Sequence, residues 1–334
     1  MKLKINSQRC SLYTKLSFLT ALLAITFLTV PSLSGKSERR EVPAAPVQTL
    51  PQPKHIVIVI EENKGFDDII KNPNAPYLNL LVKQGALLTK SYALHHPSQP
   101  NYMELFSGED QSVYNDNCPS KRQSFSKPSL GGLLLKHEFP FIGYAESLPP
   151  QSANWKNVVC KPPTNFAVKH CPWMDFKDVP LDVSQDFDTF PTDAAGFNGL
   201  PTVAIIIPDL VNDMHGVGNT PTSQEITDGD KWLRVHLDAY AQWAKAHNSL
   251  LIITWDEDGS SYTYPKFPAQ KISTSPPQNH IATILVGAMV KPKSTSDQIY
   301  THYDLLRTIE DMFGLIPLLG NSDKAKDIAD IWQI

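Results

Sequence analysis

Closely spaced cysteines and a strong net charge are both missing from this 334-residue sequence. None of its 4 cysteines forms a Cys-x-x-Cys pair, so neither a zinc ribbon nor a dithiol redox site is expected. The formal net charge is only −4, so the chain lacks the broad basic field of nucleic-acid-binding proteins, and nucleic acid is not an expected partner. Hydrophobic residues make up 41% of the chain, which is enough for a large core, and disorder is not expected.

The longest uncharged apolar run lies near the N-terminus. Basic residues precede Leu16–Val30, and proline and small residues follow it. This order predicts an export signal over residues 1–35, cleaved near Ser34 or Gly35. The run is about fifteen residues long, short for a bilayer span of roughly twenty, although an uncleaved N-terminal anchor is the alternative. The body is therefore expected to be secreted or periplasmic, with no stable membrane partner after cleavage.

The predicted export determines how many cysteines remain and whether they are oxidised. Cleavage would remove Cys10 and leave the odd set Cys118, Cys160 and Cys171. In an oxidising compartment the simplest expectation is one disulfide and one free thiol, with the pairing left open. Residues 36–53 combine charge with several prolines and predict an extended linker to the folded body.

The body shows strand-type and helix-type segments in alternation. Continuous β-branched or apolar runs predict strands at residues 55–60, 86–92, 203–207, 250–254 and 281–286, and helical spacing predicts helices at 75–84, 230–247 and 303–313. This alternation predicts an α/β fold with a mostly parallel central sheet and helices on both faces. Residues 110–200 have few periodic runs and predict a loop-rich cap insertion. In that region Trp155, Trp173 and Phe176 either line a leaving-group pocket or pack in the core, and core packing is preferred.

Polar clusters directly follow three of the predicted strands. They are Glu61-Glu62-Asn63, then Asp209, Asn212, Asp213 and His215, and finally Asp256-Glu257-Asp258. Ligands of α/β proteins bind at the carboxyl ends of the strands, so these clusters are expected to converge. One carboxylate alone could simply cap a helix. Three clusters at one sheet edge instead favour a divalent cation: Ca, Mg, Mn or Zn.

Ser98 lies between two prolines in residues 95–102 (HHPSQPNY), ahead of a predicted helix. By itself it could be a helix N-cap. Beside a bound cation, however, a serine hydroxyl can be deprotonated and attack phosphorus. With the acidic clusters present, the nucleophile interpretation is preferred.

Taken together, these motifs resemble a known family. The segments in question are Ile60–Asp67 (IEENKGFD), Pro97–Tyr102 (PSQPNY), Asn212–His215 (NDMH), Thr254–Glu257 (TWDE) and the closing 301–310. In this order they resemble the phosphoesterase family of bacterial acid phosphatase A and phospholipases C, part of the alkaline-phosphatase-like hydrolases. The resemblance covers residues 54–317 and implies a phosphoesterase domain over 54–334.

The resemblance also implies roles for individual residues. The implied metal ligands are Glu62, Asn63, Ser98, Asp256 and Glu257. Ser98 would be the nucleophile and form a phosphoserine, and Asn101 would hold a phosphoryl oxygen. His215 and His280 would stabilise the transition state, protonate the leaving group or bind a second metal ion, with Asp209 as a further possible ligand.

Two features depart from the family pattern. Glu257 is followed by Asp258-Gly259-Ser260-Ser261 where relatives often have a glycine pair, and His280 lacks a neighbouring aspartate. The remaining histidines are expected to be structural, pocket-lining, surface or core residues: His95, His96 and His302, and then His55, His137, His170, His236 and His247.

The predicted activity is hydrolysis of small phosphate monoesters, of acid-phosphatase type. A phospholipase C is the alternative within the family, disfavoured because its members usually carry long C-terminal extensions and this sequence ends at Ile334. A metal-dependent protein that binds phosphorylated ligands without turnover is the alternative of another class. A sulfatase is disfavoured because no Cys-x-Pro-x-Arg segment is present. The leaving group, the metal, the pH optimum and the oligomeric state stay open.

Overall fold

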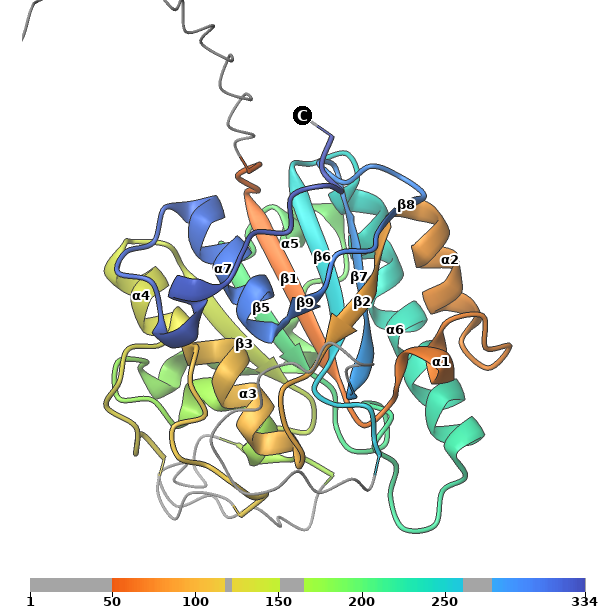
Figure 1. Ribbon diagram of the computed structural model, residues 1–334, viewed down its shortest axis with the longest axis horizontal. Helices are drawn as coiled ribbons and strands as arrows, with labels where there is room; N and C mark the ends of the chain where they lie inside the picture. The colour runs from red at the N-terminus through yellow and green to blue at the C-terminus, as the bar shows by residue number, and fades with distance from the viewer. Residues whose placement is uncertain (1–49, 118–121, 151–164, 261–277, 334) are drawn as a thin grey trace, which may run out of the picture. The chain divides into compact units, whose positions relative to one another are not determined.

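The structure is a computed structural model that describes residues 50–117, 122–150, 165–260 and 278–333 (Figure 1). The unit formed by residues 48–334 holds every element described below. The predicted export signal, most of the linker, Cys118, Cys160 and Trp155 lie outside the described residues. No helix in the described part of the chain is both long enough and apolar enough to cross a bilayer.

A sheet of nine described strands forms the centre (Figure 1). The strands are β1 His55–Glu61, β2 Ala86–Tyr92, β3 Phe141–Ala145, β4 Ser184–Asp186, β5 Val203–Ile207, β6 Ser249–Trp255, β7 His280–Gly287, β8 Ser294–Ser296 and β9 Tyr300–Thr301. Their order is β4-β3-β5-β1-β6-β7-β2-β8, with β9 also paired to β2. Only β7 among them is antiparallel to its neighbours. The carboxyl ends of β1, β2, β5 and β6 therefore meet at one edge.

Helices cover both faces of this sheet. They are α1 Phe66–Ile69, α2 Pro76–Gln84, α3 Ser98–Ser107, α4 Leu130–Lys136, α5 Ala194–Phe197, α6 Thr222–Ala244 and α7 His302–Phe313, with short 3-10 turns η3 Val168–His170, η4 Pro172–Met174, η5 Leu181–Val183, η6 Phe187–Thr189 and η7 Gly320–Lys324. Side chains of a strand alternate between faces, so Ile58 of β1 packs with α3, α4 and α7. Val59 packs with α1, α2, α5 and α6 on the other face.

The predicted fold class is confirmed, and the strands at 55–60, 86–92, 203–207, 250–254 and 281–286 all form. Helix α6 begins at Thr222 rather than at the predicted Asp230. Its first turns are polar, so they carry no apolar stripe that periodicity could detect. Strands β3 and β4 come from residues 110–200 and extend the sheet beside β5.

Candidate functional site

Ser98 is the first residue of α3 and lies at the carboxyl edge of the sheet. The chain leaves β2 at Tyr92 and turns through Pro97 before α3 starts at Ser98. The hydroxyl oxygen lies 3.1 Å from Glu62 Oε2 and 3.1 Å from Glu257 Oε1. Ser98 is only 2% exposed. Residues that follow β1, β2 and β6 thus meet at one buried hydroxyl, as the sequence predicts.

Asp256 ties the loops after β1 and β6 together. Its Oδ1 accepts hydrogen bonds from the main-chain N–H groups of Asn63 (3.0 Å) and Glu257 (2.6 Å). Its Oδ2 is buried and has no hydrogen-bond partner among the described residues. Burial, and then the charges of Glu62 and Glu257, raise the pKa of Asp256 well above its ordinary value. The negative charges of Glu62, Asp256 and Glu257 are therefore not fully compensated by positive groups of the protein.

Two aromatic side chains, Tyr102 and His170, contact the Oε1 atom of Glu62. Its Oε1 accepts from the Tyr102 hydroxyl at 2.7 Å and lies 2.9 Å from His170 Nε2. The rings of Tyr102 and His170 stack with centroids 4.9 Å apart. Burial opposes ionisation of Glu62, but the charge and hydrogen bond of His170 prevail and hold the pKa of this carboxyl well below its ordinary value. Oε2 is thereby left facing Ser98.

His170 has the buried position expected of a surface or core histidine, and it also makes contacts that the sequence did not predict. It is fully buried, but it lies between Glu62 and Asp213, whose Oδ2 is 3.6 Å from Nδ1. Burial alone would lower the pKa of His170, yet the Glu62 charge raises it to about 9. No spacing in the sequence could reveal this contact, because His170 belongs to the short turn η3 and reaches the site only through the tertiary fold.

His96 closes the opposite side of the site. Its Nδ1 contacts Glu257 Oε2 and its Nε2 lies 3.4 Å from Asp258 Oδ1. Burial alone would lower the pKa of His96, but these two carboxylates raise it to about 9. The expectation that His96 is structural or pocket-lining stays a prediction.

Asn101 and His280 use their polar atoms within the protein. The Asn101 side chain accepts from the main-chain N–H groups of Leu94 and His95 and donates to the His95 carbonyl. The His280 ring stacks on Phe66, with its Nε2 3.0 Å from the Thr89 carbonyl oxygen. In these contacts Asn101 shapes the turn before Ser98. The predicted roles of both residues in catalysis stay predictions.

His215 and Asp209 lie on the loop after β5. His215 is exposed, its Nδ1 lies 2.8 Å from the Gly216 carbonyl oxygen, and its N–H donates to Asp213. Asp209 accepts from the Ser147 hydroxyl. The Ser98 hydroxyl contacts Glu62 and Glu257 instead of these two side chains, whose predicted roles also stay predictions.

The N-terminus of α3 already holds a carboxylate. The main-chain N–H of Gln99 donates to Asp116 Oδ1 at 3.0 Å, and Lys169 Nζ lies 2.6 Å from Asp116 Oδ2. Burial would lower the pKa of Lys169, but the charges of Glu62, Asp116 and Asp256 raise it. Lys169 is therefore a cation close to the acidic cluster, and it has no motif that sequence reasoning could detect.

In the part of the chain that the structure describes, two groups of residues could hold a metal ion. The first is the predicted set of Glu62, Asn63, Ser98, Asp256 and Glu257. It fits a divalent cation because its three carboxylates are buried and Asp256 Oδ2 lacks a partner among the described residues. The second is His95, Glu104 and Asp110, which each offer one ligand atom within 4.8 Å of the others.

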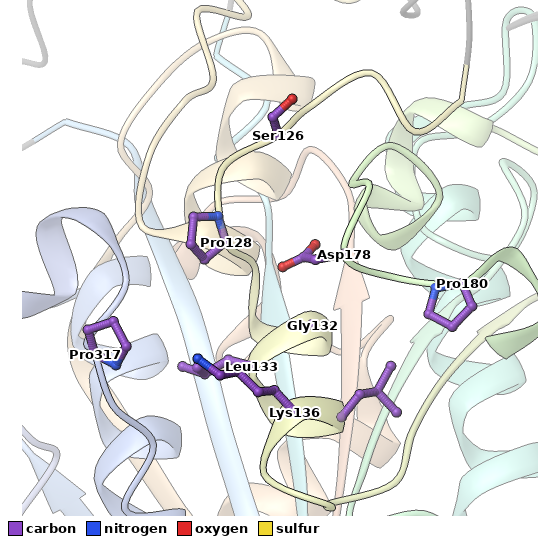
Figure 2. Close-up of a pocket in the computed structure, with 9 residues that line it drawn as sticks. Ser126, Pro128, Gly132, Leu133, Lys136, Asp178, Pro180 and Pro317 are labelled. Carbon is purple, nitrogen blue, oxygen red and sulfur yellow. The ribbon is translucent and has the colours of Figure 1, made fainter.

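A separate cavity lies beside α4 (Figure 2). This cavity of about 680 Å³ is lined mainly by Pro128, Leu133, Lys136, Pro180 and Pro317, and by Asp178. Its one carboxylate, Asp178, accepts from the N–H and hydroxyl of Ser129, the N-cap residue of α4. None of the predicted site residues lines it, so this hollow is separate from the candidate site.

The aromatic and cysteine residues near β3 belong to the core. Trp173 and Phe176 are 1% and 0% exposed, and Phe176 meets Phe106 edge to face. Both belong to the same buried cluster as α3 and α4. Cys171 is a buried free thiol.

The mostly parallel sheet with helices around it is an alkaline-phosphatase-like fold. Solved structures agree on the fold. A Vibrio parahaemolyticus protein in the alkaline phosphatase superfamily matches with a TM-score of 0.54 and 14% identity, over 80% of this chain and 68% of that one. A Pseudoalteromonas sp. sulfatase matches with a TM-score of 0.53 and 12% identity, over 84% and 74%. The chain belongs to the Phosphoesterase family, whose model matches residues 69–316.

Curated relatives narrow the comparison. A phosphatidylinositol-3-phosphatase of Mycobacterium tuberculosis is 39% identical over 283 residues, 85% of this chain and 84% of the relative. An acid phosphatase of Aspergillus fumigatus is 29% identical over 282 residues, 81% of this chain but only 57% of the relative. The chain thus spans little more than half of the fungal protein. The predicted enzyme class, a phosphoric monoester hydrolase, agrees with these relatives.

Proposed function

We propose that this protein is an exported, metal-dependent phosphatase that hydrolyses phosphate monoesters through a phosphoserine at Ser98. The observation that carries the proposal is the Ser98 hydroxyl, buried and 3.1 Å from one oxygen of Glu62 and one of Glu257. A hydroxyl placed between two carboxylates has acceptors for its proton and a fixed direction of attack. The predicted signal over residues 1–35 supports export.

The first step forms a bond between Ser98 Oγ and phosphorus and breaks the bond from phosphorus to the leaving oxygen. The Ser98 proton passes to the neighbouring carboxylate of Glu257, because His170 holds the pKa of Glu62 too low for it to act as a base. A divalent cation held by Glu62, Asn63, Ser98, Asp256 and Glu257 would lower the pKa of the hydroxyl and offset charge on the phosphoryl oxygens. Water then cleaves the phosphoserine and releases inorganic phosphate.

Phosphate binding requires a change at the start of α3. The N–H of Gln99 and the ammonium of Lys169 both contact the carboxylate of Asp116. An N–H at a helix start and a lysine are the donors that phosphate takes. We infer that a substrate phosphoryl group displaces Asp116 and takes over these donors. His215 and His280 are the candidates for protonating the leaving group.

Substrate choice has two candidates. The mycobacterial relative is named a phosphatidylinositol-3-phosphatase, which makes a monoester on a lipid headgroup a candidate beside small soluble monoesters. A phospholipase C would instead cut a diester. The test compares p-nitrophenyl phosphate, its bis-ester and p-nitrophenyl phosphorylcholine, with and without chelator, and then phosphatidylinositol 3-phosphate.

Ser98→Ala and Ser107→Ala provide a matched pair of variants. Both serines are buried in α3, but the Ser107 hydroxyl donates to the Met103 carbonyl, away from the acidic cluster. Chelator-sensitive monoester turnover that falls at least about 1000-fold in Ser98→Ala alone would support the proposal. Preference for the phosphorylcholine ester would move the assignment to phospholipase C. Phosphate binding without turnover in the metal-loaded protein would identify a binding protein.

A further inference from the structure

A second group of metal-binding side chains surrounds helix α3. His95 lies before the helix, Glu104 lies within it, and Asp110 follows its end. One ligand atom from each lies within 4.8 Å of the others. His95 and Glu104 are buried, and Asp110 is half-buried. None of the three belongs to the residue set predicted to hold a catalytic metal ion.

Glu104 shows that the group is incomplete without a further partner. It is 0% exposed, and its Oε1 lies 2.8 Å from His95 Nε2 and accepts from the Tyr303 hydroxyl at 2.7 Å. Its Oε2 is buried with no hydrogen-bond partner among the described residues. Because Oε1 contacts His95, the carboxylate end faces the group. A buried carboxylate oxygen without a donor is costly, and a cation would remove that cost.

We propose that His95, Glu104 and Asp110 form a second cation site, for a divalent transition metal of the Zn²⁺ type. One imidazole nitrogen with two carboxylates is a ligand set that Zn²⁺ accepts, leaving the fourth position to water. The residues around Ser98 offer only oxygen ligands, which Mg²⁺, Ca²⁺ and Mn²⁺ prefer. The two sites therefore differ in the metals they select.

The position of the site gives the ion a structural role. The His95 main chain is fixed by Asn101, and its carbonyl also accepts from Asn279 Nδ2 at 2.8 Å. Three residues later the chain reaches Ser98. An ion bound by His95, Glu104 and Asp110 joins this turn to the body of α3 and to the loop after it. It would hold Ser98 in place without contacting the substrate.

Metal content is the direct test. The purified protein is dialysed against Zn²⁺, its bound metal is counted, and Co²⁺ is added separately to detect nitrogen ligation by its visible spectrum. Glu104→Gln and Asp110→Asn are compared with Glu310→Gln. Glu310 is an equally buried glutamate with an unpartnered Oε2 among the described residues, but its Oε1 accepts from the Leu319 N–H and it is not one of the three ligands of this group. Asp256→Asn separates this site from the one at Ser98.

We expect the proposed site to bind one Zn²⁺ ion per chain in the wild type, in Glu310→Gln and in Asp256→Asn. In Glu104→Gln and Asp110→Asn its Zn²⁺ affinity should fall at least about 10- to 100-fold. Zn²⁺ should also raise the Tm of the wild type more than that of these two variants. Equal Zn²⁺ affinity in Asp110→Asn and wild type would overturn the proposal, as would loss of all Zn²⁺ in Asp256→Asn. Because Asp110 is half-buried, its variant stays informative if Glu104→Gln fails to fold. The readout is independent of phosphatase activity, so the proposed function can fail without affecting it.

Discussion

The two faces of the sheet carry acidic residues at the same edge, but they use them differently. On the α6 face, Glu146 accepts from Trp232 Nε1, Asn212 Nδ2 and the Asp209 N–H. On the α3 face, Glu62 and Glu257 converge instead on the Ser98 hydroxyl. Glu146, whose oxygen atoms accept hydrogen bonds from fixed donors, stabilises the fold. Glu62 and Glu257, which both contact the Ser98 hydroxyl, are placed to take part in a reaction.

Two neighbouring glutamates make the contrast sharpest: Glu61 ends β1, and Glu62 follows it directly. Glu61 is 0% exposed and Glu62 is 0% exposed. Both Glu61 oxygens lack a hydrogen-bond partner among the described residues, and burial, followed by the charge of Asp213, raises its pKa well above the ordinary value. Glu62 is held ionised by His170. A buried carboxylate therefore marks a candidate site only where other reacting or ligand groups face it, as Ser98 faces Glu62.

The largest expected effect comes from changing one carboxylate on each face. Asp256→Asn keeps the shape but removes charge from the predicted metal set, and should lower kcat/KM for p-nitrophenyl phosphate at least about 100-fold. Glu146→Gln keeps an acceptor oxygen and should leave kcat/KM nearly unchanged, with stability lowered by about 1 kcal/mol. Equal losses of activity in the two variants would end the distinction between the faces.

The second-largest effect should come from removing the contact between His170 and Glu62, which should lower the affinity for the activating metal ion. His170→Gln removes the imidazole that fixes Glu62 Oε1, and should weaken binding of the activating metal about 10- to 100-fold. His55→Gln is the control, because His55 is also buried but lies at the other end of β1, with Nδ1 2.9 Å from the Pro201 carbonyl oxygen. Metal titration of both proteins is the measurement. An unchanged metal affinity in His170→Gln would show that this histidine only packs in the core.

Lys169 and Asp116 should affect substrate affinity in opposite directions. Lys169→Met should raise KM for p-nitrophenyl phosphate about tenfold, the equivalent of about 1.4 kcal/mol, with a smaller change in kcat. Lys169→Arg should recover part of the loss. Asp116→Asn should lower KM, because the competing carboxylate is gone. Steady-state kinetics decide, and a higher KM in Asp116→Asn would show that this residue assists binding instead.

A smaller effect concerns stability in acid. His302 is buried, with its Nε2 2.9 Å from the Trp255 carbonyl oxygen, and burial lowers its pKa from 6.5 to about 4. Between these two pH values the unfolded chain takes up a proton that the folded chain refuses, so stability falls as pH falls from 6.5 to 4, by at most about 3 kcal/mol. Urea unfolding of His302→Gln should show a shallower decline over this range. Parallel pH profiles would contradict the assignment.

Sequence reasoning predicted those parts that local patterns encode. The β-branched runs gave the strands, and polar residues directly after them gave Glu62, Asp256 and Glu257. His170, Lys169 and Tyr102 were not singled out, because their roles depend on which segments the fold brings together. Strand β4 was missed because its three residues, Ser184–Asp186, show no alternation that a period-2 pattern could detect.

The central claim is that Ser98 forms the covalent intermediate. Acid quenching of the metal-loaded enzyme during turnover of p-nitrophenyl phosphate, followed by mass spectrometry of its peptides, tests it directly. We expect a phosphoryl group on Ser98 in the wild type and in Ser107→Ala, with none on the corresponding peptide of Ser98→Ala. Full turnover by Ser98→Ala, or a phosphoryl group on a different residue of the active wild type, would contradict the account.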